Sequence, residues 1–244
     1  MGHRRHILTL FLCLLPLAAW AGPPFITDDA DPVDYGHYEL IPFYSMDRAS
    51  DGAEIQGPGA DFNYGIWPEV HLNLSAVFTH ELPATGGTAY GLGDLRLGAK
   101  WRLVDETSDR PELAVYPAVI FPTGDAHEGL GNGQVSYQFP VWIEKNWGDW
   151  TSYGGGGWTL NHAPGARDYF FGGWQIQRNL SEGTFVGGEI FAQGSDAAGS
   201  AGYTLMNLGG GIRLAEGFSL IFTAGHSFAG ASHQVAYMGL YCTW

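Results

Sequence analysis

The sequence predicts an all-β protein, a transmembrane antiparallel up-and-down β-barrel of the outer-membrane type with about 12 strands. Apolar and polar residues alternate along most of the chain, which is typical of strands with two different faces. The connections between these segments are short at one end and long at the other, as in outer-membrane barrels. Only 15% of the residues are charged, 14% are aromatic and 37 are glycine. This composition fits a β-rich protein that exposes apolar surface to something other than water.

Composition also excludes several classes of protein. The chain has 244 residues, of which 45% are hydrophobic, too many for a disordered protein. Its glycines follow no three-residue period, which excludes collagen. Eleven basic residues stand against 25 acidic ones, a net charge of −14. A nucleic-acid partner needs clustered positive charge, so we expect none.

The first element is a predicted signal peptide, residues 1–21. Arg4 and Arg5 precede the apolar run Ile7–Ala19, which is too short to span a bilayer. An Ala-x-Ala cleavage site ends at Ala21, so the mature chain is expected to have 223 residues and to start at Gly22. An uncleaved anchor helix is the alternative, and the shortness of the apolar run argues against it.

Cleavage changes the charge and the cysteine content. It removes two of the 11 basic residues and none of the 25 acidic ones, so the mature net charge is −16. It also removes Cys13 and leaves Cys242 as the only thiol. One thiol cannot form an intrachain disulfide, so core burial or membrane insertion must hold the chain together.

The second element, residues 22–35, is acidic and rich in proline. Asp28, Asp29, Asp31 and Asp34 fall within seven residues. Calcium prefers such oxygen ligands, but their spacing matches no known loop, so we expect no metal. We predict either a solvated periplasmic segment or a plug folded into the lumen.

The barrel itself is predicted to occupy residues 36–244. In Val70–Phe78, Leu72 and Leu74 share one face, while His71 and Asn73 share the other. Pro117 and Pro140 lack the amide that a sheet ladder needs, so we expect bulges there. The twelve predicted strands are 36–47, 54–65, 70–79, 91–103, 111–121, 134–146, 150–160, 169–179, 184–193, 202–213, 217–227 and 234–244.

Aromatic residues at the short turns support membrane insertion. Trp67, Trp147 and Trp150 lie at or beside those turns, and Trp244 ends the chain. Tryptophan prefers the boundary between bilayer and water. We expect outer-membrane lipid as a partner, and the barrel-assembly machinery as a second partner through the strand that ends in Trp244. A soluble secreted β-sandwich is the alternative, because sandwich cores also alternate.

Several segments resemble the outer-membrane family known as "putative MetA-pathway of phenol degradation", which is also called transporter-like. The resemblance covers nearly the whole mature chain and depends on the order and spacing of its motifs. It implies an outer-membrane barrel that passes small organic compounds, with aromatic or hydrophobic ones as candidates. The matching segments are Pro23–Asp29, Asp34–Glu39, Gly91–Lys100, Phe121–Asp125, Phe171–Trp174 and Tyr237–Leu240.

One face of residues 94–102 concentrates positive charge. Arg96, Lys100 and Arg102 are three of the nine mature basic residues, and each would cost about 2–4 kcal/mol at mid-depth in lipid, so we expect them to face the lumen. Such charges either select solutes or form a salt-bridged network that fills a narrow barrel. The candidate lumen residues are His71, Asn73, Asp94, Arg96, Lys100, Arg102, Asn207 and Arg213, with Asp61, Asp94, Glu39 and Glu189 as opposing carboxylates.

Catalysis has little support in the sequence. His226 and Ser227 are adjacent, as are Ser232 and His233, and neighbours on a strand point to opposite faces. Neither pair can therefore act as nucleophile and base without a bulge. We expect no enzyme activity, no catalytic residue and no cofactor.

The favoured hypothesis is a Gram-negative outer-membrane channel that passes small organic solutes by passive diffusion through a charged lumen. One alternative is a closed barrel that serves as a surface binding or structural protein, using the loops 122–133 and 194–200. An outer-membrane hydrolase is the least supported alternative.

Overall fold

The computed structural model describes residues 23–244. The predicted signal peptide and its cleavage site lie outside the described residues. In the described part of the chain, no helix has the length and apolarity to cross a membrane.

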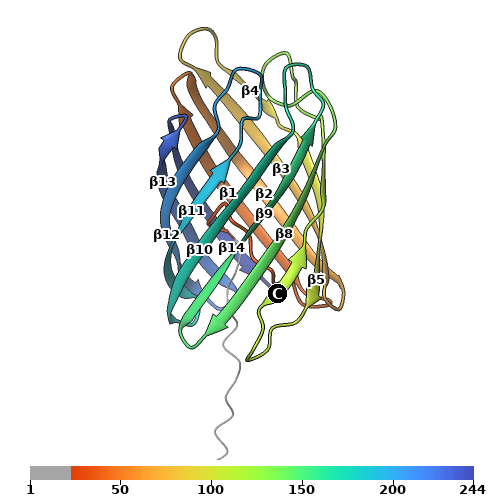
Figure 1. Cartoon of the computed structure of the whole chain (residues 1–244), viewed down its shortest axis with the longest axis vertical. Coiled ribbons are helices and arrows are strands. Elements are labelled where there is room, and N and C mark those ends of the chain that lie inside the picture. The colour runs from red at the N-terminus through yellow and green to blue at the C-terminus, as the bar shows by residue number, and fades with distance from the viewer. Residues whose placement is uncertain (1–22) are drawn as a thin grey trace, which may run out of the picture.

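The described chain forms one closed antiparallel barrel (Figure 1). It closes because β1 (Tyr38–Ala49) pairs with β14 (His233–Thr243). Two spanning strands are interrupted, and each is split into two segments: β4 (Ala89–Leu92) with β5 (Leu95–Val104), and β6 (Glu112–Val115) with β7 (Ala118–Phe121). The fourteen segments therefore make twelve spanning strands, which confirms the predicted fold. The others are β2 (Gly52–Trp67), β3 (Val70–Pro83), β8 (Ser136–Trp147), β9 (Trp150–Asn161), β10 (Tyr169–Ser181), β11 (Thr184–Gln193), β12 (Tyr203–Ala215) and β13 (Phe218–Gly230).

Pro117 and Pro140, at which bulges were predicted, both lie beside the same interruption of the sheet. Pro117 lies in the gap between β6 and β7, as expected. Pro140 lies in β8, whose pairing with β9 runs without a shift, so the bulge predicted there is wrong. The Pro140 oxygen accepts the Tyr116 N–H at 3.1 Å, so the missing amide of Pro140 faces the same gap. Neither proline therefore removes a donor from a continuous ladder.

Connection length distinguishes the two ends of the barrel. At one end, here the short-turn end, four connections have two residues each, and residues 105–111 form a fifth, longer one. Gly183 and Gly217 hold positive φ angles of 68° and 70° in two of these turns, a conformation that glycine adopts without strain. The opposite, long-loop end carries residues 84–88, 122–135, 162–168 and 194–202. It also has two tight connections, at residues 50–51 and 231–232.

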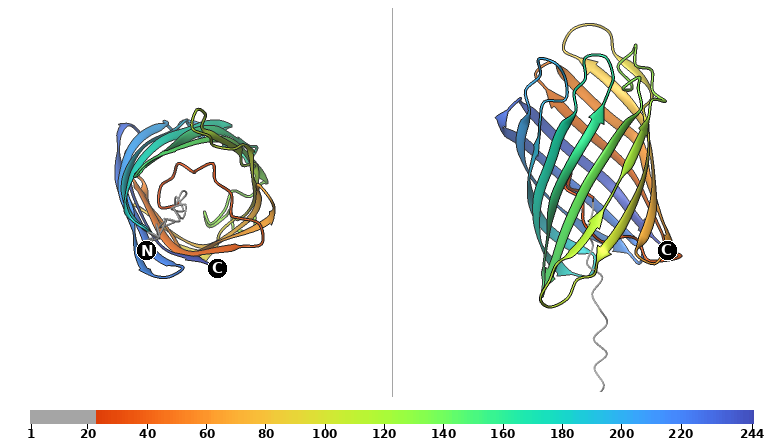
Figure 2. Two further views of the ribbon diagram at one scale, coloured as in Figure 1. Left: turned by 90° about the horizontal axis from the view of Figure 1, so that it is seen from below. Right: turned by 45° about the vertical axis from the view of Figure 1, so that its right-hand side comes forward.

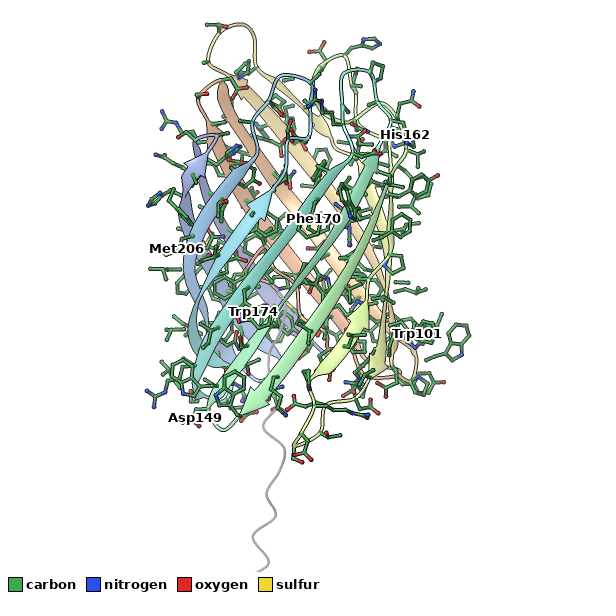
Figure 3. All side chains as sticks on the ribbon, viewed as in Figure 1. Trp101, Asp149, His162, Phe170, Trp174 and Met206 are labelled. Atoms are coloured by element: carbon green, nitrogen blue, oxygen red, sulfur yellow. The ribbon has the colours of Figure 1, made fainter. Side chains whose placement is uncertain are left out.

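The wall is apolar outside and polar inside. Trp101, Trp174 and Met206 point away from the barrel in Figure 3, and Trp101 is 53% exposed. Lys100, the neighbour of Trp101 in the chain, is 3% exposed and points inward. The tryptophans at the short-turn end are exposed as well. An apolar exterior on a closed barrel satisfies every condition for a lipid-embedded sheet, because no strand edge is left unpaired.

The segment before β1 lies inside the barrel. Figure 2 shows it within the ring of strands, and its residues 23–35 are called the plug below. Ala30 of the plug is fully buried and belongs to an apolar cluster with Ala114, Tyr116 and Trp142 of the wall. Of the two states that its acidic sequence allows, a solvated segment or a plug, the structure has the plug.

Candidate functional site: the plugged lumen

Glu189 of β11 holds the first part of the plug through its main chain. Its two carboxylate oxygens accept the N–H groups of Ile26, at 2.9 Å, and of Thr27, at 2.8 Å. The Asn207 side chain donates a third hydrogen bond to Glu189 at 2.6 Å. Glu189 is 2% exposed, and three donors compensate its buried charge.

Lys100 of β5 holds the centre of the plug through its side-chain carboxylates. Its ammonium donates to Asp29 at 2.6 Å and to Asp28 at 3.1 Å, and it reaches the Asp31 carbonyl oxygen at 3.5 Å. These three acceptors match the three protons that a lysine can donate. The ion pair with Asp29 is almost completely removed from water.

Arg102, one inward position further along β5, binds the plug nearer the short-turn end. It donates to Asp31 at 2.7 Å and to Glu112 at 3.3 Å, and it also contacts Glu69. Burial raises the pKa of Asp31, and the Arg102 guanidinium opposes that rise. This cluster is partly solvated, so it contributes less to docking than the Lys100 pair.

Two further wall residues bind plug amides. His71 Nδ1 accepts the Val33 N–H at 3.0 Å, so the proton of a neutral ring lies on Nε2. Glu144 of β8 accepts the Ala30 N–H at 3.3 Å. The plug is thus fastened between Ile26 and Val33 by side chains from four different strands, β3, β5, β8 and β11.

Arg96 lies beyond this network, toward the long-loop end. Its guanidinium donates to Asn73 at 2.7 Å and to the Tyr116 hydroxyl at 3.3 Å, and it stacks 4.6 Å from the centre of the Tyr116 ring. The Asn73 amide group in turn donates a hydrogen bond of 2.8 Å to the side-chain oxygen of Asn63. Within the described residues, Arg96 has no carboxylate at ion-pair distance. It is held by neutral groups, unlike Lys100 and Arg102.

Six of the eight candidate lumen residues bind the plug, support a residue that binds it, or line the cavity beside it, but two do not. Asp94 lies in the break between β4 and β5, where it accepts the N–H groups of Gly124, at 3.0 Å, and Asn132, at 2.7 Å. It therefore fastens the long loop and does not oppose Arg96 or Lys100. Arg213 pairs with Glu182 at 2.6 Å near the short turns, away from the charges of β5.

The carboxylates expected to oppose the basic residues make no ion pair with them in the described structure. Within the described residues, none of Asp61, Asp94, Glu39 and Glu189 forms an ion pair with Arg96, Lys100 or Arg102. The plug supplies both carboxylates of Lys100 and one of those that bind Arg102, because it enters the lumen at the level of Lys100. Glu39 accepts a hydrogen bond from Asn63 at 3.1 Å and another from the Tyr241 hydroxyl, so its partners are neutral groups and not the basic residues.

Glu144, Glu112 and Tyr116 take part in the site and were not among the predicted residues. Glu144 could have been found, because it alternates with Trp142 and Pro140 on the inward face of β8. Tyr116 lies just before Pro117, in the break between β6 and β7, where alternation cannot predict which side chains point inward. No local signal identifies Tyr116.

Two hollows border the plug. The inner cavity, about 310 Å³, lies between the plug and side chains of β1, β2, β3 and β5, with Asp61, Asn73 and Arg96 among them. The mouth cavity, about 410 Å³, lies at the short-turn end and is lined in part by Arg213, Glu216 and Trp244. The plug therefore narrows the lumen without filling its whole cross-section.

The histidines and serines near the chain end are the candidate catalytic groups, and the acidic residues and histidines are the candidate metal ligands. His233 Nδ1 lies 2.9 Å from Asp47 at the long-loop end, but the Ser227 hydroxyl accepts the backbone N–H of His233 and does not contact its ring. Ser227 and His233 are therefore not arranged as a nucleophile and its base. No group of three or more His, Cys, Asp or Glu side chains in the described chain is arranged to hold a metal.

A closed twelve-stranded barrel with an apolar exterior and a plugged polar lumen defines a transmembrane β-barrel protein. The family model described as "Putative MetA-pathway of phenol degradation" matches residues 25–239. The chain belongs to this family, as its motifs predicted. No curated protein sequence matches the chain.

Two solved structures share the fold. An outer membrane channel from Pseudomonas putida F1 is 13% identical, with a TM-score of 0.71 over 88% of this chain and 98% of that chain. The translocator domain of the autotransporter NalP from Neisseria meningitidis is 11% identical, with a TM-score of 0.56 over 87% of this chain and 90% of that chain. At such low identity the likeness shows the fold, an outer-membrane barrel.

Proposed function

We propose that the mature protein is a non-enzymatic channel in the outer membrane of a Gram-negative bacterium and that it passes small organic solutes by passive diffusion. The observation that carries the proposal is the hollow lumen: polar cavities border the plug inside a sealed, lipid-facing barrel. The family name and the channel of similar fold support the same class of function. In this proposal the predicted signal peptide, cleaved after Ala21, directs export.

The orientation follows from connection lengths. Outer-membrane barrels place short turns in the periplasm and long loops outside the cell. The mouth cavity then opens toward the periplasm, and the loops around residues 122–135 and 194–202 face the exterior. A solute would enter between these loops and pass alongside the plug.

A closed barrel with a binding or structural role is the second candidate, and the fastening of the plug favours it. Five wall side chains hold residues 26–33. Four of them are almost completely buried: Glu189, Lys100, His71 and Glu144. Such a plug would block any wide path permanently. The channel proposal requires that solutes pass beside the docked plug or after it moves, whereas a closed barrel would let no solute pass.

Planar-bilayer conductance and liposome swelling test the proposal. We expect small, steady conductance from the purified mature protein and faster swelling with small solutes than with larger ones. A variant with the plug loosened, Lys100→Met, should conduct more. A folded barrel that seals against every small solute, in the wild type and in this variant, contradicts the channel and supports the closed-barrel alternative.

A further inference from the structure

The two cavities that border the plug are separated by residues that line both of them. Asp31, Pro32, Val33, Glu39 and Tyr241 line both of them. These five residues are called the septum below. Asp61 and Arg96 lie nearer to the long-loop end than His71 and Lys100, as the register of β2, β3 and β5 shows. The inner cavity therefore extends toward the exterior side, and the mouth cavity toward the short turns.

The lining of the two cavities has an excess of negative charge. Its basic residues are Arg96, Lys100 and Arg213, of which Lys100 is paired with two plug carboxylates and Arg213 with Glu182. The lining carboxylates are Asp28, Asp29, Asp31, Asp34, Glu39, Asp61, Glu182 and Glu216. Eight acids thus face three bases. Asp34, Glu39, Asp61 and Glu216 have no ion pair among the described residues.

A second observation is a buried donor that needs a polar partner in the inner cavity. His71 lines it and is 3% exposed, and its Nε2 has no hydrogen-bond partner in the described structure. Because Nδ1 accepts from Val33, Nε2 of the neutral ring is a donor without an acceptor. A water molecule in the cavity, or the hydroxyl of an organic solute, supplies an acceptor there.

We propose that solutes pass beside the plug, from the inner cavity through the septum to the mouth cavity, and that Asp61, Glu39, Asp34 and Glu216 make this path selective for cations. The substrate class is small organic ammonium compounds, together with inorganic cations. This inference rests on the proposed channel function. A narrow passage lined by one sign of charge concentrates counter-ions and excludes ions of that sign.

The test measures the reversal potential of the full mature protein in a planar bilayer with a tenfold KCl gradient. We expect the wild type to prefer potassium over chloride. The double variant Asp61→Asn/Glu216→Gln removes one carboxylate from each cavity and should move the reversal potential toward zero. Asp109→Asn/Glu128→Gln is the matched control, because it removes the same total charge from one connection at each end of the barrel, outside both cavities.

Organic ions give the second arm of the test. Choline and isethionate are small, permanently charged and of opposite sign, so bi-ionic potentials report their permeability directly. We expect choline to be several-fold more permeant in the wild type and in the control pair. Heat-modifiable migration on gels checks that every variant folds.

The outcomes separate the inference from the channel. A conducting wild type that favours chloride or isethionate, or favours neither sign, overturns cation selectivity and leaves the channel intact. Equal shifts in the cavity pair and the control pair overturn the assignment to the two cavities, because overall surface charge would then explain selectivity. A barrel that conducts no ion, even with Lys100→Met, overturns the proposed function itself.

Discussion

The two halves of the lumen wall differ in how closely they pack against the plug and in which of its groups they bind. On the half built by β8–β11, inward side chains pack closely around it, and Tyr153 and Gln175 are fully buried. On the half built by β1–β3, β5 and β14, the same plug leaves the inner cavity open. The packed half binds plug amides through Glu144 and Glu189. The hollow half also binds one plug amide, through His71, but in addition it binds plug carboxylates through Lys100. Only the hollow half therefore combines an electrostatic tether with a path for solutes.

The tether on the hollow half should give the largest effect. Lys100→Met leaves Asp28 and Asp29 without their cation, and breaking a buried pair in this way costs about 3–5 kcal/mol. We expect the plug to leave the lumen while the barrel stays folded. Increased conductance and new protease cleavage within residues 23–35 would report its release.

Lys145→Met is the control for that experiment. Lys145 pairs with Glu106 at 2.7 Å, but both side chains are partly exposed. Such a pair contributes about 0–1 kcal/mol, so the plug should stay docked. If the two variants release the plug equally, the buried tether is not what holds it.

The packed half is tested next by Glu189→Gln. Hydrogen bonds to a charged group contribute about 1.5–3 kcal/mol, and the neutral amide offers only one acceptor oxygen to Ile26 and Thr27. Exchange of these two backbone amides with solvent should become at least about tenfold faster, because each 1.4 kcal/mol corresponds to a factor of ten. Glu128→Gln in the long loop should leave their exchange unchanged, and unchanged exchange in Glu189→Gln would contradict the anchor.

The sequence predicts the inward side chains of the wall better than it predicts their partners in the plug. Alternation with a period of two places Arg96, Lys100 and Arg102 inside, because it is a local property of one strand. The same alternation places Asp94 on the inward face with these residues, but this prediction is wrong. Asp94 lies in the interruption between β4 and β5, where the strand pattern does not hold. The twelve strands follow from the same local pattern and are confirmed.

The partners of the inward charges could not be predicted in the same way. Asp28 and Asp29 lie more than 70 residues before Lys100, and no periodic pattern connects them. Their acidity is equally compatible with a solvated segment or a metal loop. Only the position of residues 23–35 inside the barrel shows that they compensate Lys100. Glu189 was a candidate, but its partners are main-chain amides, which carry no sequence signal.

Gly173→Ala tests how closely the packed half approaches the plug. A Cβ atom at Gly173 would lie 2.1 Å from Thr27 Oγ1, so either β10 or the plug must shift. Overpacking of this kind costs about 1–3 kcal/mol. We expect weaker docking, measured as faster exchange of the Thr27 amide. Gly87→Ala, which meets no atom within 4 Å, is the control. Equal exchange in both variants would show that the wall does not limit the plug at this point.

The smallest effect is expected at the septum, where the hollow half narrows. Val33→Ala removes two buried methyl groups, a loss of about 1–2 kcal/mol in docking free energy. Conductance should rise because the partition becomes thinner, while the reversal potential should stay constant because every lining carboxylate remains. Val186→Ala makes the same change on the exposed outer face and should alter neither quantity. If Val33→Ala changes selectivity as well as conductance, the septum itself discriminates between ions, and the carboxylates on either side of it do not act alone.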